Sequence, residues 1–332
     1  MVLSEPTRSY PGGTALERNV GFLAASVFSV AYVAAPIHVF LALGVTVRHP
    51  FWWGAWLMNL PILVSFMLPS RLVERFSNPL FCSWPMRQIP KYFEYEEYHE
   101  TTDSELRSTG KNYLVGAHPH GVFSFAGVCA AVATHSSPDG FGAALPEEAP
   151  TAAASVVKLF PILKDVLAVF GLIDASSSTL SKRLSRPRGS LVLYIGGMIE
   201  LFYSSPKKEV VFLKQRKGFI KLALRAGADV VPVYMFGNTT VLSVLAWGPL
   251  ASLSRSLGMS VTLFWGRFGL PMPKPVRLTY VRGRPLGMPH IENPSPEDIE
   301  KWHATYCEKL TELFESYKGR NPDYKHKDLI IK

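Results

Sequence analysis

The sequence predicts a mixed α/β protein, with a mostly parallel sheet flanked by helices and an N-terminal transmembrane or re-entrant helical hairpin. Two uncharged apolar runs near the start of the chain predict the hairpin. Beyond residue 111, short runs of β-branched and aromatic residues alternate with helical patterns. Such alternation is typical of parallel sheets that are covered by helices on both faces.

The composition agrees with contact between this chain and lipid. Of its 332 residues, 48% are hydrophobic and only 18% are charged, against roughly 25% charged in an average soluble domain. The formal charge of +9 suits an anionic membrane surface, nucleic acid or a phosphorylated cosubstrate, without choosing among them. Three scattered cysteines argue against a disulfide framework and favour a reduced, cytosol-facing domain.

The hairpin is predicted within residues 19–70. Uncharged runs extend over Val20–Val47 and Phe51–Ser70, with only Arg48-His49-Pro50 between them. A helix needs about 20 apolar residues to cross a bilayer, so both runs are long enough, and the short connection requires a tight reversal. Basic residues flank the pair on both outer sides, so both ends should face the cytosol. The first run is too long for a cleaved signal peptide.

The alternative is a buried hairpin in a soluble protein. Trp52, Trp53 and Trp56 begin the second run, and tryptophan is enriched at membrane interfaces, which favours the membrane. Pro36 and His38 within the first run could mark a kink or a shallow re-entrant helix instead of a straight span.

The remaining chain divides by composition into four parts. Residues 1–18 are expected to form a cytosolic tail, and residues 71–110 a charged connector along the bilayer surface. Residues 111–320 should form the α/β domain, and residues 321–332 a C-terminal tail.

Within the α/β domain, a helix is predicted over Gly218–Ala226. The last helix should follow Ser295, with Pro296 at its first position and Asp298 where a capping box has an acid. The apolar segment Val241–Leu270 is either a buried helical insertion or a second membrane-facing surface. Strands are predicted at Tyr113–Gly116, Leu191–Ile195, Val210–Leu213 and Asp229–Phe236.

The motif His118-Pro119-His120-Gly121 directly follows the first of these strands. Free histidine titrates near ~6.5, so one of the two rings could act as a general base at neutral pH. The same residues could instead form a turn with surface histidines. The sequence has no Cys/His cluster for zinc, no Gly-x-Ser-x-Gly elbow and no nucleotide-binding glycine loop.

Two further motifs could take part in chemistry. Gly196-Gly197 precedes Glu200 in an apolar neighbourhood, where a buried carboxylate costs free energy unless it is paired. A histidine partner would explain Glu200, and so would a helix start stabilised by the helix dipole. Arg216-Lys217-Gly218 leads into a helix and could bind phosphate, although such a charge run is more often a solvated loop.

Taken together, these segments resemble the diacylglycerol acyltransferase type 2 family, which also includes monoacylglycerol and wax-alcohol acyltransferases. The family's usual Phe-Gly-Glu is Phe236-Gly237-Asn238 here, so a role for that acid cannot be transferred. Phe40-Leu41-Ala42-Leu43 fits the family's proposed neutral-lipid motif, as many apolar helices would. The resemblance rests mainly on YLVGAHPHGVFSFAG (113–127), YIGGMIEL (194–201) and RKGFIKLALRAGADVVPVYMFGN (216–238).

The resemblance implies a glycerolipid acyltransferase-like core. It implies transfer of an acyl group from acyl-CoA, as cosubstrate, to the free hydroxyl of diacylglycerol on the cytosolic face of the endoplasmic reticulum. Lipid droplets are a second expected location. The expected partners are acyl-CoA, diacylglycerol and membrane lipid, with no nucleic acid, no metal and no bound cofactor; a homo-oligomer is compatible. The acceptor could also be a monoacylglycerol or a long-chain alcohol.

Residue roles follow from this resemblance. His120 is the expected general base, with His118 as the alternative base or a structural partner, and Glu200 would hold the imidazole tautomer. Backbone N–H groups near Gly121 or Gly197 would stabilise the oxyanion. The remaining residues expected to matter are Pro119 and Gly196 in the two motifs, Arg216, Lys217 and Gly218 at the CoA phosphates, and Phe40, Leu41 and Leu43 at lipid.

Two rival functions compete with this interpretation. Glycerophospholipid acyltransferases carry a His-x4-Asp motif, but Phe123 and Phe125 stand at the positions of that acid. A non-catalytic lipid-binding scaffold would explain the hairpin and leave Glu200 unexplained. Asn238-Thr239-Thr240 is an N-glycosylation sequon, and a cytosolic domain predicts that it carries no glycan.

Overall fold

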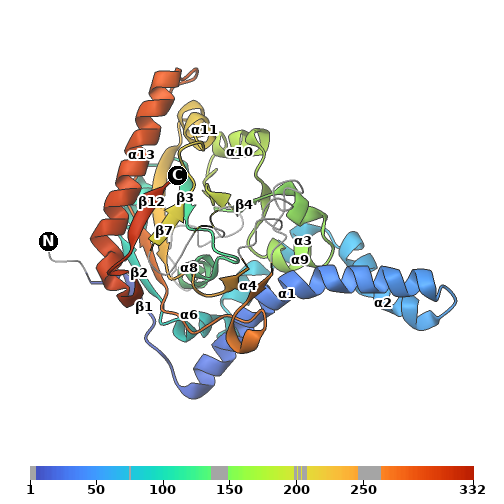
Figure 1. The fold of residues 1–332 in the computed structure, drawn as a ribbon. Coiled ribbons are helices and arrows are strands. Elements are labelled where there is room, and N and C mark those ends of the chain that lie inside the picture. Colours follow the sequence, from blue (N-terminus) through green and yellow to red (C-terminus); the bar gives the residue numbers. More distant parts are fainter. Residues whose placement is uncertain are drawn as a thin grey trace.

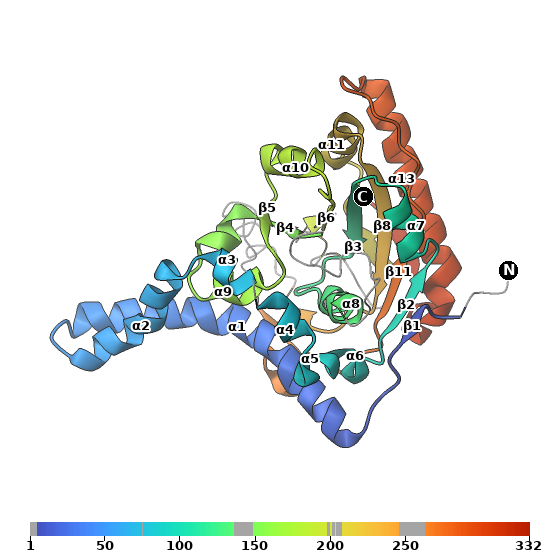
Figure 2. The ribbon, with the colours of Figure 1, turned by 180° about the vertical axis from the view of Figure 1, so that it is seen from behind.

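The computed structural model describes residues 5–74, 76–135, 149–197, 200, 203, 208–245 and 263–332. Figures 1 and 2 show a central sheet with helices on both sides and a helical hairpin that projects from one corner. The predicted insertion within Val241–Leu270 lies partly outside the described residues, and so do Met198 and Ile199 of the glycine motif.

In the described part of the chain, eight strands form the main sheet in the order β1-β2-β11-β8-β3-β6-β4-β5. The strands from β8 to β5 pair in parallel, as do β11 and β2, whereas β11 runs antiparallel to β8. The predicted mostly parallel sheet is therefore confirmed. The bounds are Arg8–Ser9 (β1), Glu96–His99 (β2), Thr279–Arg282 (β11), Asp229–Phe236 (β8), Tyr113–His118 (β3), Leu191–Leu193 (β6), Thr151–Ala153 (β4) and Ile173–Asp174 (β5).

Strand β3 runs two residues beyond its predicted end and includes His118. Every residue of β3 and of its neighbour β8 is buried, as expected for central strands covered on both faces. Because side chains alternate along a strand, Leu114, Gly116 and His118 face one side of the sheet, and Val115 and Ala117 face the other.

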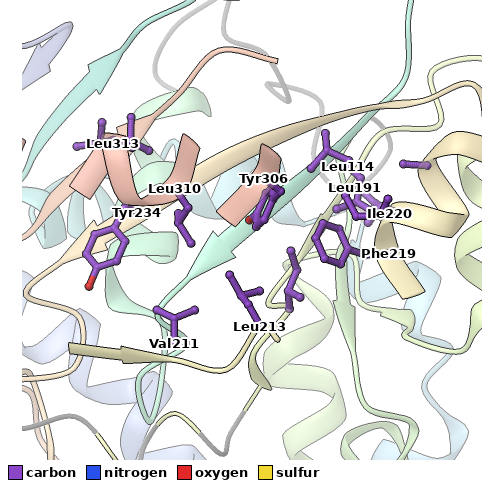
Figure 3. Close-up of a cluster of buried hydrophobic side chains, with 14 of the residues drawn as sticks. Leu114, Leu191, Val211, Leu213, Phe219, Ile220, Tyr234, Tyr306, Leu310 and Leu313 are labelled. Carbon is purple, nitrogen blue, oxygen red and sulfur yellow. The ribbon is translucent and has the colours of Figure 1, made fainter. Parts of the chain in front are cut away.

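Helix α13 (Pro296–Tyr317) and helix α11 (Gly218–Ala226) cover the first side of the sheet. Figure 3 shows Tyr306, Leu310 and Leu313 of α13 packed with Leu114 and Tyr234 of the sheet. The predicted capping box of α13 is present: the Ser295 hydroxyl accepts from the Asp298 N–H at 3.1 Å, and the Asp298 carboxylate accepts from the Ser295 N–H at 3.0 Å.

Helix α8 (Phe125–His135) and the first half of helix α1 (Ala15–Arg48) cover the other side of the sheet. The core on this side joins Val115 and Val233 of the sheet to Phe125 of α8 and Phe28 of α1. The segment expected as a cytosolic tail, residues 1–18, contains the start of α1, and its residues Arg8 and Ser9 pair with β2.

The hairpin consists of α1, with 34 residues, and α2 (Trp53–Met67), with 15. Among the described helices, α1 is long and apolar enough to cross a membrane, and only 11% of its most apolar window is buried. The prediction that the second run also gives a helix of spanning length is wrong, because α2 ends just before Pro69 and a residue that precedes proline disfavours the helical conformation.

The shorter elements complete the fold. Strand β12 (Asp328–Ile331) pairs in parallel with β7 (Lys208–Val211), so the expected C-terminal tail is part of a small second sheet. Strands β9 (Ser243–Val244) and β10 (Phe264–Trp265) form an antiparallel pair. The remaining helices are α3 (Ser70–Glu74), α4 (Ser77–Phe81), α5 (Trp84–Arg87), α6 (Ile89–Tyr92), α7 (Asp103–Ser108), α9 (Leu163–Ala168), α10 (Ser177–Leu184), η1 (Ser155–Leu159), η3 (Arg267–Gly269), η4 (Lys318–Arg320) and η5 (Pro322–Tyr324).

Candidate active site

A cavity of about 870 Å³ lies on the α8 side of the sheet and is lined mainly by apolar side chains. Helix α1 supplies one wall through Tyr32, Val33, Pro36 and Ile37. A volume in this range suits a ligand of several hundred Å³, such as part of an acyl chain. Among the residues that line the cavity, those with polar or titratable side chains include His120, Ser124, Tyr194, Arg216, Glu97, His99, Tyr280 and Arg282.

The turn that follows β3 carries the predicted histidine motif, residues 118–121, which we call the HPHG turn. A cis peptide bond joins His118 to Pro119. Gly121 has a φ of 64°, and a Cβ at this position would lie 2.8 Å from the side-chain nitrogen of Asn238. Both the backbone conformation and the close approach therefore require glycine at position 121.

His118 is fully buried and does not line the cavity. Its Nδ1 lies 3.4 Å from Oε1 of Glu200, and its Nε2 lies 3.1 Å from the hydroxyl of Tyr306 on α13. Because a carboxylate can only accept a hydrogen bond, Nδ1 carries the proton in this arrangement. Both ring nitrogens of His118 are thus engaged with protein groups on the side of the sheet away from the cavity.

The ring of His120, in contrast, reaches the cavity. Its Nδ1 lies 2.6 Å from the carbonyl oxygen of Gly121. Because a carbonyl oxygen can only accept a hydrogen bond, Nδ1 carries the proton, and Nε2 of the neutral ring carries none. The ring packs edge-on against Tyr194, with centroids 4.9 Å apart. Burial lowers the pKa of His120 and outweighs the opposing effects of the Gly121 carbonyl and Glu200.

Glu200 is 1% exposed and contacts both histidines of the HPHG turn. Its Oε2 accepts from the backbone N–H of His120 at 3.0 Å, and its Oε1 accepts from the N–H of Phe212 at 3.1 Å. Glu200 thus has a histidine partner, but its ring contact is with His118. The acceptor that orients the ring of His120 is the Gly121 carbonyl and not the predicted glutamate.

The two glycines of the second motif differ in their surroundings. A Cβ on Gly196 would lie 1.7 Å from Oε1 of Glu200, so glycine makes room for the carboxylate. Gly197 lines the cavity with a φ of 66°, but its N–H donates to the carbonyl of Tyr194 at 3.2 Å. In the described part of the chain the N–H of Gly121 has no such partner, but Gly121 is not among the residues that line the cavity.

The three residues expected at the CoA phosphates do not share one environment. Arg216 is exposed and lines the cavity. Lys217 forms an ion pair with Glu300 of α13, so its charge is already compensated. Gly218 is the first residue of α11 and is exposed. The geometry therefore directs Arg216 toward a ligand in the cavity more than its two neighbours.

The expected lipid residues Phe40, Leu41 and Leu43 lie on the projecting half of α1, where they are 69%, 56% and 51% exposed. They do not line the cavity. The residues of α1 that do so lie earlier in the helix, at Tyr32, Val33, Pro36 and Ile37. The predicted motif therefore lies on the outer surface of the protein and not at the cavity.

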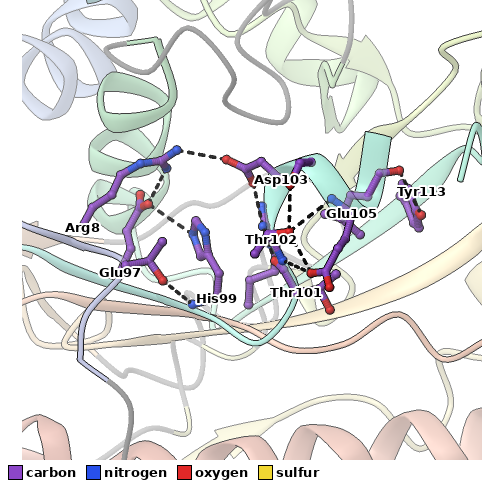
Figure 4. Close-up of polar contacts among 12 residues, drawn as sticks. Arg8, Glu97, His99, Thr101, Thr102, Asp103, Glu105 and Tyr113 are labelled. Carbon is purple, nitrogen blue, oxygen red and sulfur yellow. Dashed lines mark hydrogen bonds and ion pairs between the residues drawn. The ribbon is translucent and has the colours of Figure 1, made fainter. Parts of the chain in front are cut away.

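Sequence reasoning missed a buried polar cluster at the β2 end of the cavity, drawn in Figure 4. Arg8 forms ion pairs with Glu97 at 2.6 Å and with Asp103 at 3.0 Å, and Arg282 pairs with Asp103 at 2.6 Å. His99 lies 3.2 Å from Glu97. Burial would raise the pKa of Glu97, yet His99 and Arg8 hold it below its usual value. The alternation of Glu97 and His99 along β2 was the available signal.

Asn238 was noted in the sequence only as the replacement of an acid and as part of a glycosylation sequon. Its side chain is 1% exposed and hydrogen-bonded to the HPHG turn. A buried, bonded amide is inaccessible to a glycosyltransferase in the folded protein. The prediction that this sequon carries no glycan stays a prediction.

The fold places a histidine in base-competent form beside an apolar cavity, and a helix long enough to cross a membrane forms one wall of that cavity. This arrangement in an α/β fold can perform proton transfer on an apolar ligand held in the cavity.

Comparison with known proteins specifies the family. The family model for diacylglycerol acyltransferases matches residues 69–332, and the chain belongs to this family, which confirms the resemblance seen in the sequence. The chain is 35% identical to 2-acylglycerol O-acyltransferase 3 of Homo sapiens over 225 residues. It is 34% identical both to acyl-CoA wax alcohol acyltransferase 1 and to diacylglycerol O-acyltransferase 2 of Mus musculus, over 227 and 232 residues.

These alignments cover 63%, 64% and 64% of this chain, and 65%, 68% and 58% of the three relatives in the same order. The chain thus spans about two thirds or less of the length of these relatives. A solved 1-acyl-sn-glycerophosphate acyltransferase, PlsC from Thermotoga maritima, is similar over 85% of this chain and 97% of its own, with a TM-score of 0.38 and 11% identity.

Proposed function

We propose that this protein is an acyl-CoA-dependent O-acyltransferase that esterifies the free hydroxyl of diacylglycerol to form triacylglycerol. The observation that carries the proposal is the ring of His120, which faces an apolar cavity with its Nε2 available to accept a proton. Membership of the diacylglycerol acyltransferase family supports the reaction class. The reaction as proposed uses acyl-CoA as a cosubstrate and needs no metal or bound cofactor.

The chemistry assigns one task to His120. An alcohol is a weak nucleophile at its own pKa, so Nε2 of His120 takes the hydroxyl proton while the alcohol oxygen attacks the thioester carbonyl carbon. The tetrahedral intermediate then collapses as its carbon–sulfur bond breaks. The departing CoA thiolate takes the proton back from the imidazolium ring. The products are the new ester and free CoA, and His120 returns to its neutral form.

The surrounding groups support this step without exchanging protons in it. The Gly121 carbonyl keeps Nδ1 protonated, which is the task of the acid in a Ser-His-Asp triad. The N–H of Gly121, which has no hydrogen-bond partner in the described part of the chain, would donate to a developing oxyanion. His118 and Glu200 act as structural partners that hold the main chain of the turn through the N–H of His120. Arg216 would bind the CoA phosphates.

The arrangement of α1 supports access from a membrane. Ile37 both lines the cavity and is 52% exposed, so the outer surface of α1 and the cavity wall meet at this residue. An acceptor dissolved in the bilayer can reach the cavity at this point without crossing water. We place the domain on the cytosolic face of the endoplasmic reticulum membrane, with lipid droplets as a second location.

Relatives named for 2-acylglycerol, wax alcohol and diacylglycerol acceptors share 34–35% identity with this chain. Identity therefore does not choose the acceptor, and a monoacylglycerol or long-chain alcohol acceptor remains the second candidate function. A non-catalytic lipid-binding scaffold is the alternative of another class.

The decisive experiment measures ester synthesis by membranes that contain the wild type or His120→Ala. Labelled acyl-CoA is supplied with diacylglycerol, monoacylglycerol or hexadecanol as acceptor. We expect His120→Ala to lose about 10²- to 10⁴-fold in rate with every acceptor at equal protein abundance, because it removes the base. His135→Ala, which changes a histidine on α8 away from the cavity lining, is the matched control and should keep its rate.

Undiminished synthesis by His120→Ala would refute the base assignment. If the protein is a non-catalytic scaffold, membranes with the wild type or with His120→Ala should make no more ester from acyl-CoA than membranes that lack the protein. The acceptor that gives the highest kcat/KM with the wild type distinguishes the two enzymatic candidates.

A further inference from the structure

Asn238 stands immediately after the left-handed Gly237 at the end of β8, and none of the steps above uses it. Its amide nitrogen donates to two consecutive carbonyl oxygens of the HPHG turn, those of Pro119 at 3.0 Å and His120 at 2.9 Å. Its side-chain oxygen accepts from the N–H of Ala126 in the first turn of α8 at 3.2 Å. One buried side chain therefore joins β8, the HPHG turn and the start of α8.

The chemistry of these partners leaves the amide only one orientation. Carbonyl oxygens can only accept and the N–H of Ala126 can only donate, so the nitrogen must face the turn and the oxygen must face α8. The N–H of Ala126 is one of the first four of its helix and has no partner inside the helix. An aspartate of the same size would place an acceptor against two acceptors and lose both bonds to the turn.

Packing also fits the turn to Asn238. A Cβ at Gly121 would lie 2.8 Å from both the side-chain nitrogen and the carbonyl oxygen of Asn238, so the main chain of the turn passes directly against this residue. The same stretch of main chain carries the Gly121 carbonyl that accepts from Nδ1 of His120 at 2.6 Å. The position of that carbonyl decides where Nε2 points.

We propose that Asn238 is a positioning residue for the general base: it holds the Pro119 and His120 carbonyls so that the Gly121 carbonyl fixes the tautomer and direction of the His120 ring. This inference rests on the proposed role of His120. Asn238 contacts neither the ring nor the cavity, so it acts through the main chain and not on the substrate.

The test compares purified Asn238→Ala and Asn238→Ser with the wild type by kcat, by KM for acyl-CoA and by the pH profile of kcat/KM. For Asn238→Ala we expect kcat to fall about 10- to 100-fold, as for other small misplacements of a catalytic group, with KM changed less than about twofold. Asn238→Ser keeps one hydrogen-bond donor, its hydroxyl group, and should give an intermediate kcat. This second variant keeps the test decisive if Asn238→Ala does not accumulate as folded protein.

The pH profile separates positioning from stability. The Gly121 carbonyl favours the protonated ring, so its displacement should move the ascending limb of the profile to lower pH. Glu200 and Tyr194 are the other titratable groups that face His120 in the described part of the chain, and both are unchanged in these variants.

Asn112 offers a matched control. Its amide nitrogen donates to the carbonyls of Leu184 at 2.7 Å and Arg186 at 2.6 Å, and its side-chain oxygen accepts from the N–H of Gly189 at 2.6 Å. Asn112 directly precedes β3, so it lies at the opposite end of that strand from His118. Asn112→Ala should lower thermal stability as Asn238→Ala does, and should leave kcat and the pH profile per folded molecule unchanged.

A wild-type kcat and pH profile in both Asn238 variants would overturn the inference, and so would losses that match those of Asn112→Ala. If His120→Ala is inactive while the Asn238 variants behave as wild type, only the role of Asn238 fails. If His120→Ala stays active, the proposed mechanism itself fails, and the inference fails with it.

Discussion

The two histidines of the HPHG turn have opposite surroundings although they are only two residues apart. His118 ends β3 with its ring on the α13 side, between Glu200 and Tyr306. His120 lies beyond the strand, where the Gly121 carbonyl occupies one ring nitrogen and the cavity is open to the other. Hydrogen-bond partners, and not the residue type, therefore separate a structural histidine from a candidate base.

At the residue scale, the lowered pKa of His120 predicts a pH dependence. The base must be neutral to accept the alcohol proton, and burial makes protonation of the ring harder, so activity should persist into more acidic solution than free imidazole would allow. We expect the ascending limb of kcat/KM to lie below pH ~6.5. A limb above that value, measured over pH 5 to 8 with the enzyme checked for stability, would contradict this expectation.

The helical hairpin is the element whose length decides how the protein meets a membrane. Helix α1 has 34 residues, and its first half packs on the sheet domain while its second half pairs with α2. Helix α2 has 15 residues, or about 22 Å at the ~1.5 Å rise of an α-helix. The hydrocarbon core of a bilayer is about 30 Å thick, so α2 is too short to cross it upright.

At the element scale, we therefore expect the hairpin to enter the membrane and return without exposing its connection on the far side. A flexible insert with an Asn-Gly-Thr sequon, placed between His49 and Pro50, should stay unglycosylated in endoplasmic reticulum membranes. A control that also lengthens α2 by six leucines reaches spanning length and should acquire the glycan. Glycosylation of the first variant, removed by a glycosidase, would show that the native hairpin spans.

In the molecule as a whole, the first and the last strand each pair with a strand that is distant in sequence. Strand β1 adds to the sheet edge and brings Arg8 to the buried carboxylates of Glu97 and Asp103, while β12 pairs with β7. Figure 2 shows β1 beside β2 at the sheet edge, on the opposite side of the domain from the hairpin. The polar cluster thus connects the N-terminal segment to the wall of the cavity.

At this scale the cluster predicts acid sensitivity. The folded-state pKa values of Glu97 and Asp103 are lowered, so their contribution to stability is present above their ordinary values of 4.5 and 3.8 and is lost as the pH falls through the folded values. Arg8→Ala should lower the free energy of unfolding at pH 7 by about 2 kcal/mol, below the roughly 3 to 5 kcal/mol for a fully buried pair, because Arg282 and His99 remain.

Thermal unfolding of the detergent-purified protein between pH 7 and pH 3 measures this prediction. Lys309→Ala breaks the exposed pair between Lys309 and Glu312 and should change stability by no more than about 1 kcal/mol. Equal effects of the two substitutions would show that the cluster does not stabilise the fold.

Features that depend on neighbours along the chain could be predicted from the sequence. The long apolar run gave α1, the glycine and capping signals gave α11 and α13, and β-branched runs gave β8 with its predicted bounds. Periodicity, capping and side-chain hydrophobicity act within a few residues, so they can be read in order along the chain. The motif residues His118, His120 and Glu200 were also identified, and the structure brings them together.

Only the tertiary structure decided which histidine faces the cavity, which acceptor holds its ring, and that Asn238 is bonded to the same turn. These contacts join β3, β8, the start of α8 and α13, which lie far apart in sequence. The cluster of Arg8, Glu97, Asp103 and Arg282 likewise joins the N-terminal segment to β2, α7 and β11. Such partners are set by the order of strands in the sheet, and no local pattern of residues encodes that order.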